Sequence, residues 1–243
     1  ARPAGRQGAV PPITVPGREL TPLAFGLVLL TLRLLAMPLA IWMFASLALL
    51  VGALAGRETG ASIAWLLDPF ADAHSLMALL ALAAVAVPLT LLLQALVLRW
   101  SPKAPVGTSS RWSLGYLRIW LRSGMLEAAG VWLSGSLFWP VWLRLAGMRV
   151  GRDCEISTIL DVLPEHVSIG AHSFLADGIY LGVPALQAGT VTVRPTALGE
   201  GTFLGNHVVV HGGQQLPDDL LLGVCTVADE ARMAKGSSWF GQP

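Results

Sequence analysis

Histidine is the natural general base near neutral pH, because its side chain gains and loses a proton in that range. The chain has five histidines, and two of them, His207 and His211, lie close together beside Asn206. An imidazole can take a proton from an attacking amine or hydroxyl, and the Asn206 amide can donate a hydrogen bond to a developing oxyanion. These three residues are the candidate catalytic group. The alternative is that the two histidines only face solvent at an edge of the fold.

Three carboxylates are candidates for orienting a histidine or holding a cationic amine: Asp161, Asp177 and Glu200. Asp177 precedes Gly178, a pair that is also typical of a plain turn. Cys154 and Cys225 lack the spacing of a zinc site, so we expect no bound metal. The sequence also lacks a Walker A motif, a nucleophile elbow and a dinucleotide-binding fingerprint.

The fold that positions these side chains is indicated by a sequence repeat of six residues. Aliphatic residues recur at this spacing upstream and downstream of a slip in phase, at Ile169, Leu175 and Leu181, then at Leu198, Leu204, Val210, Leu216 and Leu222. A period of six fits neither a helix nor a plain strand. It is typical of a parallel β-helix, in which each hexad forms one short strand and a turn. The pattern predicts a triangular prism of about four coils between Val150 and Val227, with Cys154 inside and residues 183–190 as an excursion loop.

The composition indicates a membrane protein. Of 243 residues 13% are charged and 54% apolar, and the mean hydropathy is +0.63, whereas a soluble domain is about 25% charged. This excludes a disordered chain, a disulfide-dense scaffold and an ordinary soluble enzyme. The net charge of +1 is a cancellation, because residues 99–149 carry +6 and residues 150–243 carry −6.

The low number of charged residues is due to two long apolar stretches of the sequence. A membrane span needs about 20 mostly apolar residues, so we expect an interfacial lead-in to Arg33, a span over residues 34–55 and a second span over residues 75–98. Pro38 and Pro88 would kink these helices. A buried soluble helix pair is the alternative. Basic residues precede the first span and follow the second, which predicts that both termini are cytoplasmic.

Residues 111–147 combine tryptophan with arginine, a composition that favours the lipid headgroup level. We expect helices lying in the cytoplasmic interface. The alternatives are a third spanning helix over residues 124–143, which would place Glu127 inside the bilayer, and aromatic packing on the protein's own core. Because these basic residues lie beside membrane spans, nucleic acid is not an expected partner. The predicted membrane-interface residues are Trp112, Trp120, Trp132, Trp139, Trp142, Arg118, Arg122 and Arg144.

The sequence therefore divides into five predicted parts. They are a linker (1–21), a transmembrane helical hairpin (22–110), Trp/Arg-rich interfacial helices (111–147), a β-helix domain (148–230) and a tail (231–243). The fold class is an α+β membrane protein with two transmembrane helices, interfacial helices and a short parallel β-helix.

The hexad repeat resembles that of the left-handed β-helix hexapeptide acyltransferases. More closely, residues 22–243 resemble the membrane-embedded C-terminal region of ε-poly-L-lysine synthetase-type non-ribosomal peptide synthetases. In that family an adenylation and a carrier domain precede membrane helices and three tandem acyltransferase-like domains, whereas this chain has one such domain. The resemblance rests on residues 139–151 (WPVWLRLAGMRVG), 168–170 (SIG), 175–178 (LADG), 204–210 (LGNHVVV), 222–224 (LGV) and 236–243 (GSSWFGQP).

The resemblance implies a left-handed coil and an aminoacyl or acyl transferase. Such an enzyme forms amide bonds from a carrier-protein thioester and an amine, with phosphopantetheine on the carrier, or CoA, as the donor. It also implies His207 as the base, with His211 as the second choice, and Asn206 as the oxyanion donor. The acidic β-helix would attract cationic amino acids such as lysine or diaminobutyrate.

Two other functions stay open at this point. One is an acyl-CoA-dependent O- or N-acyltransferase on a lipid or sugar, for which Arg152 and Arg194 are the cations available in the coils. The other is a non-catalytic membrane scaffold or export conduit.

The expected partners are adenylation and carrier domains, upstream or in trans, the lipid bilayer, and copies of the same domain in a homotrimer or a tandem pseudo-trimer. The expected location is the inner (cytoplasmic) membrane, multi-pass, with a cytoplasmic β-helix domain. The start without Met and the end at Pro243 lead us to expect a piece of a longer synthetase.

Overall fold

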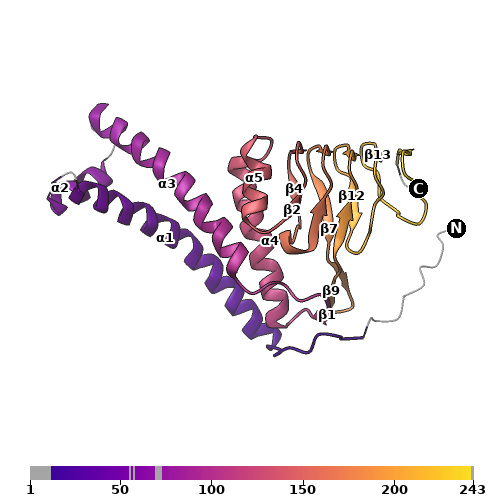
Figure 1. Ribbon diagram of the computed structural model, residues 1–243. Coiled ribbons are helices and arrows are strands. Elements are labelled where there is room, and N and C mark those ends of the chain that lie inside the picture. Colours follow the sequence, from indigo (N-terminus) through magenta and orange to yellow (C-terminus); the bar gives the residue numbers. More distant parts are fainter. Residues whose placement is uncertain (1–11, 55, 57, 69–72, 242–243) are drawn as a thin grey trace. The chain divides into compact units, whose positions relative to one another are not determined.

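The computed structural model describes residues 12–54, 56, 58–68 and 73–241 (Figure 1). The chain forms two compact units. The first comprises residues 22–93, and the second comprises the residues before Pro22 together with those from Gln94 onward.

The first unit is helical. It contains α1 (Pro22–Leu54), α2 (Thr59–Leu67) and most of α3 (Ala73–Trp100). Helix α1 runs as one helix of 33 residues, and its division into an interfacial lead-in to Arg33 and a span over residues 34–55 stays a prediction. The predicted end of the first span, Ala55, lies outside the described residues. Helix α2 was not predicted; beside it, the Trp65 indole donates a hydrogen bond to the Ser75 carbonyl at 3.1 Å.

One of the two predicted spans meets the length and composition of a membrane helix. Among the described residues, α3 is the helix that is long and apolar enough to cross a bilayer, and it continues through Pro88. The described parts of α1 contribute two shorter apolar stretches, Pro22–Leu34 and Phe44–Leu54. A hairpin of two spanning helices therefore stays a prediction.

The second unit contains a parallel β-helix with three faces, as the hexad period predicted (Figure 1). The chain visits the faces in turn, and each strand pairs in parallel with the corresponding strand of the next coil. The first face holds β2 (Arg149–Val150), β5 (Val167–Ile169) and β10 (Thr196–Leu198). The second face holds β3 (Glu155–Ile156), β6 (Phe174–Leu175), β11 (Phe203–Leu204), β13 (Leu221–Leu222) and β14 (Ser238–Trp239). The third face holds β4 (Ile159–Leu160), β7 (Ile179–Val183) and β12 (Val209–His211).

The hexad aliphatics form the core of this β-helix. Every aliphatic of the predicted inward set from Ile169 to Leu222 is buried, and Leu175, Leu204 and Leu222 stack in register on the second face. Burying such a side chain contributes about 1.5–3 kcal/mol, so the column is a main source of stability. Cys154 is also buried, as predicted. The tail adds a strand that was not predicted, because β14 pairs with β13.

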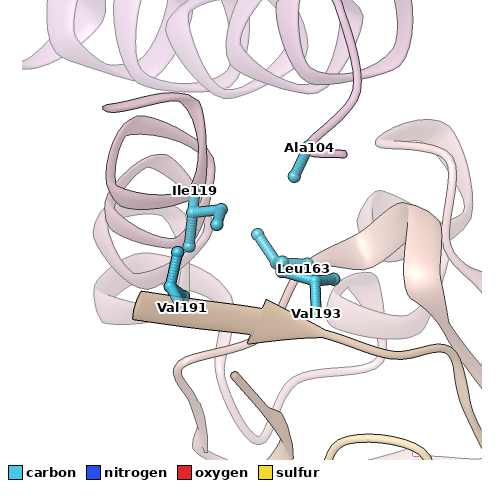
Figure 2. Packing of buried hydrophobic residues seen from close by; sticks show 5 residues of the cluster. All are labelled: Ala104, Ile119, Leu163, Val191 and Val193. Atoms are coloured by element: carbon cyan, nitrogen blue, oxygen red, sulfur yellow. The ribbon is translucent and has the colours of Figure 1, made fainter. Parts of the chain in front are cut away.

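The excursion loop leaves the β-helix and forms a separate antiparallel sheet. Its strands β8 (Ala185–Gln187) and β9 (Thr190–Val193) pair with each other, and β9 pairs with β1 (Gly107–Ser110). Figure 2 shows the buried cluster at this sheet, made by Ala104, Ile119, Leu163, Val191 and Val193. The described part of the predicted linker is ordered against β1, since Thr14 and Val15 both donate to the Thr108 carbonyl, at 2.9 and 3.0 Å.

Two helices, α4 (Leu114–Leu133) and α5 (Phe138–Leu145), contact the first coil of the β-helix (Figure 1). Trp139 and Trp142 are buried and stacked, with ring centroids 5.2 Å apart, and the Trp139 indole donates to the Ser157 carbonyl at 3.1 Å. Arg122 is buried as well. The prediction that these three residues face lipid is therefore wrong, because the helices use them to cover the protein's own core.

The other predicted interface residues divide by exposure. Arg118 and Trp132 are exposed, whereas Trp112 and Trp120 are half-buried. Arg144 is half-buried and donates from its guanidinium to the carbonyls of Val150 and Gly151. For the exposed residues a membrane-surface role stays a prediction.

Two further structural elements complete the described chain: η1 (Pro164–His166), a short 3-10 turn between the first and second coils, and the turn over residues 134–137 that separates α4 from α5.

Candidate acid–base site on one corner of the β-helix

The corner between the second and third faces brings His207 next to Asp177. In successive coils the same corner place is taken by Gly178, His207 and Cys225, all with positive φ, at 69°, 58° and 57°. The His207 N–H donates to the Asp177 carbonyl at 2.9 Å, and the Cys225 N–H donates to the Asn206 carbonyl at 2.9 Å. The turn therefore stacks these residues coil upon coil. We call Ser157, Thr158, Asp177, Asn206 and His207 the His207 corner.

Gly178 makes room for the imidazole of His207. A Cβ added at Gly178 would lie 2.5 Å from Nδ1 and 2.8 Å from Cε1 of that ring. Real Cβ atoms do not approach other atoms so closely, so the ring occupies the space that a side chain at Gly178 would need. The positive φ of Gly178 also favours glycine there. Since His207 and Cys225 take a similar φ at the same place, the position of the imidazole is the stronger reason for glycine at 178.

Hydroxyl groups of the first coil hold the Asp177 carboxylate. Ser157 Oγ donates to Asp177 Oδ1, and Thr158 Oγ1 lies 3.3 Å from the same oxygen. The hydroxyl of Ser134, the residue that ends α4, lies 3.1 Å from that of Thr158. The Ser157 hydrogen bond is the main cause that lowers the pKa of Asp177 below its usual value. Hydrogen bonds from Thr158 and the charge of the nearby His207 lower this pKa further. Asp177 is therefore ionised at neutral pH.

Asn206 lies in the same corner with its amide oriented. Its Oδ1 accepts a hydrogen bond from the Asp177 N–H at 3.2 Å. Since a backbone N–H needs an oxygen acceptor, the amide nitrogen of Asn206 is the end directed elsewhere. Both Asn206 and His207 are exposed. The corner thus presents to solvent an imidazole, an amide donor and a fixed carboxylate.

The remaining predicted site residues do not join this cluster. His211 ends β12, four residues beyond His207, which itself lies at the corner that precedes this strand. Glu200 lies on the corner between the first and second faces, where its N–H donates to Asp218 at 3.0 Å. Asp161 follows β4 at the end of the third face and donates its N–H to Glu127 at 3.2 Å. Of the three predicted carboxylates, Asp177 alone lies in the His207 corner.

Ser134, Ser157, Thr158 and Gly178 belong to the site but were not predicted to. A signal for two of them was present in the hexad pattern. The register aligns Ile156, Leu175 and Leu204 on the second face, so the residues that follow each of them occupy the same corner. Ser157 and Thr158 come directly after Ile156. In the same way, Asp177 comes two residues after Leu175, and Asn206 comes two residues after Leu204. Extending the repeat to the first coil would have placed the hydroxyls beside Asp177.

The fold is a three-faced parallel β-helix built on six-residue repeats, and comparisons with known proteins give the chain a relative. It is 34% identical over 146 residues to the Delta-poly-L-ornithine synthetase of Acinetobacter baumannii (strain AB307-0294). The match covers 58% of this chain and 11% of the relative, so the chain corresponds to a small part of that synthetase. The resemblance to a domain of a poly(amino acid) synthetase, predicted from the sequence, is thereby confirmed. No family model matches the chain.

Solved structures give weaker likenesses. A hexapeptide-repeat containing acetyltransferase from Vibrio cholerae is 14% identical, with a TM-score of 0.37, covering 56% of this chain and 92% of its own. A maltose O-acetyltransferase from Clostridium difficile 630 is 12% identical, with a TM-score of 0.33, covering 51% and 83%.

Proposed function

We propose that this chain is an amide-bond-forming transferase domain that joins the acyl group of an aminoacyl thioester to the neutral amine of a cationic amino acid, as part of a poly(amino acid) synthetase. The observation that carries the proposal is that His207 lies beside the Asp177 carboxylate, which Ser157 holds by a hydrogen bond, on an exposed corner of the β-helix. Similarity to part of a Delta-poly-L-ornithine synthetase supports it. The relative's name makes ornithine a reasonable cationic amino acid to test.

In this reaction the amine nitrogen attacks the thioester carbonyl carbon, and the new C–N bond forms as the amine loses a proton to His207. The ionised Asp177 stabilises the imidazolium that results. The Asn206 amide nitrogen donates a hydrogen bond to the oxyanion. When the tetrahedral intermediate collapses, the C–S bond breaks and the sulfur takes the proton that His207 returns, so that it leaves as a neutral thiol.

The distribution of basic residues favours a carrier-bound donor over CoA. Arg152 lies on the corner between the first and second faces, where its carbonyl accepts from the His172 N–H at 2.9 Å. Arg194 lies against Gly213, between the third and first faces. These two arginines are on different corners and do not form one pocket for the CoA phosphates. Phosphopantetheine on a carrier domain needs no such pocket.

The remaining expectations belong to the same proposal. Helix α3 anchors the chain in the inner membrane, with α1 as a second span and the β-helix on the cytoplasmic side. Adenylation and carrier domains supply the loaded thioester, and copies of the domain assemble as a trimer or tandem pseudo-trimer. The charge of −6 over residues 150–243 raises the local concentration of cationic substrate.

The test supplies the full chain, purified in detergent, with an ornithyl thioester and free ornithine, and follows amide formation by mass spectrometry. The thioester is offered in two forms, on a phosphopantetheine carrier and on CoA. We expect dipeptide from the carrier form. Amide formed from CoA alone would favour the acyl-CoA-dependent transferase, and no amide from either donor would leave the non-catalytic scaffold.

A further inference from the structure

A cavity of about 480 Å³ lies next to the His207 corner, between the α4–α5 turn and the start of the β-helix. Its wall includes Leu137 and Pro140 on the helical side and residues 153–157 with Phe174 on the β-helix side. This volume is in the range of small-molecule sites, which are commonly 300–1,000 Å³. It is large enough to admit an amino acid.

The charge of the cavity wall favours a cation. Asp153 and Glu155 contribute two carboxylates, and both residues are exposed. Arg144 is the basic residue in the wall, but its guanidinium donates to the carbonyls of Val150, at 2.9 Å, and Gly151. Because Arg144 is held by the backbone, it does not neutralise the carboxylates by direct pairing. Asp153 also lies 3.7 Å from His172 Nδ1, whereas Glu155 extends from the outer surface of β3.

The apolar part of the wall fits an aliphatic chain. Leu137 is exposed and Pro140 packs beside it on α5. Phe174 is about four-tenths exposed and stacks on Phe203, with ring centroids 5.0 Å apart. Methylene groups between two polar ends would contact these surfaces while the charged end meets the carboxylates.

Ser157 connects the cavity to the acid–base pair. It lines the cavity and donates to Asp177 Oδ1. A molecule that reaches Ser157 in the cavity is therefore separated from the Asp177 carboxylate by the Ser157 side chain. Acidic groups, an aliphatic surface and a neighbouring base together match one class of molecule, a diamino acid.

We propose that this cavity is the acceptor subsite, and that it binds the cationic diamino acid whose amine is acylated. Asp153 and Glu155 hold one ammonium group, Leu137 and Phe174 contact the methylenes, and the reacting amine lies at the Ser157 end. The statement that the amine at the Ser157 end reacts rests on the proposed function, whereas the binding of a cationic diamino acid in the cavity does not depend on it.

The test measures binding of L-ornithine and L-norvaline to the full detergent-solubilised chain by calorimetry. Norvaline has the same carbon chain without the terminal amine. We expect ornithine to bind at least about tenfold more tightly, since a charge-assisted hydrogen bond contributes about 1.5–3 kcal/mol. The double variant Asp153→Asn, Glu155→Gln should lose this preference, whereas Glu200→Gln, on an exposed carboxylate of a later coil, should keep it.

Equal affinity for the two amino acids, or unchanged ornithine affinity in the double variant, would overturn the subsite. Displacement of ornithine by pantetheine would also overturn it, because the cavity would then hold the donor. His207→Gln separates the two proposals. If His207→Gln binds ornithine as the wild type does, the subsite is supported even when no amide is formed. If the double variant forms amide with an unchanged KM for ornithine, the subsite is contradicted and the proposed function is not.

Discussion

Two polar clusters in the same unit differ in burial. Arg122 and Glu165 form an ion pair with 2.7 Å between Nε and Oε1, and their side chains are 5% and 3% exposed. Asp177 and His207 lie together on a corner that is open to solvent. In each cluster a cationic or titratable nitrogen lies near a carboxylate, but only the second cluster is exposed, so that a substrate can reach it.

The buried cluster ties the end of α3 to α4 and the β-helix. Arg122 donates to the Leu98 carbonyl at 2.7 Å and to the Ser101 hydroxyl at 2.6 Å, and the Ala104 N–H donates to Glu165 at 2.9 Å. Carbonyls at the end of a helix have no partners within it, and a cation stabilises them. Arg122 therefore caps α3.

The comparison shows how burial assigns a role. A buried charge needs a partner of opposite charge, because leaving it alone costs several kcal/mol, and a buried group held in this way is not reached by a ligand. The His207 corner instead fixes its carboxylate through hydroxyl donors and leaves the imidazole open. The predictions below test this division between structural and chemical roles.

The largest effect on stability is expected for Arg122→Met. Removing one partner leaves Glu165 charged and buried, so the free energy of unfolding should fall by about 3–5 kcal/mol. Denaturant unfolding of the full chain in detergent measures this change. Arg118→Met, on the exposed face of the same helix, should change it by less than about 0.5 kcal/mol. Equal effects of the two substitutions would contradict the capping role.

Gly178→Ala should impair the acid–base pair. The new Cβ would displace the His207 ring and also adopt a strained φ, which costs about 1–3 kcal/mol. The matched control is Gly189→Ala, where φ is also positive, at 79°, but nothing lies within 4 Å of the added Cβ. Both variants should lose similar stability, and only Gly178→Ala should lower the rate of amide formation, by about tenfold or more. A similar rate in both would mean that the position of the ring is unimportant.

Ser157→Ala should change the pH dependence of stability. The Ser157 hydrogen bond lowers the pKa of Asp177 from its usual value of 3.8, so its contribution is present at pH above that value and is lost as the pH falls through the folded-state pKa. The variant should be less stable than the wild type at neutral pH, and this difference should disappear in acid. Ser237→Ala, whose hydroxyl bonds the Ala234 carbonyl, should show a difference that does not depend on pH.

The smallest effect is expected for His211→Gln. Because His211 ends β12 and His207 lies at the corner that precedes this strand, the variant should keep its rate within about threefold, well below the 10²–10⁴-fold contribution of a general base. A loss as large as that would make His211 the base and would revise the site.

Local periodicity explains which parts could be predicted. The aliphatics from Ile169 to Leu222 specify a β-helix by their spacing, and Asn206 and His207 are neighbours in the chain, so their proximity follows directly. Arg122 was assigned to a lipid surface because it lies among tryptophans, and nothing local indicates that Glu165, 43 positions later, is its partner. Likewise, nothing in the local sequence distinguishes Gly178 from an ordinary turn residue, because the imidazole that lies against it comes from the next coil.

The central claim is that His207 is the base, and the rate of amide formation in a single turnover tests it most directly. The measurement compares wild type with His207→Gln, using an ornithyl thioester on a carrier and saturating ornithine, with the unfolding free energy of both chains measured in parallel. We predict a rate lower by about 10²–10⁴-fold with stability unchanged. An unchanged rate in a folded His207→Gln chain would contradict the account.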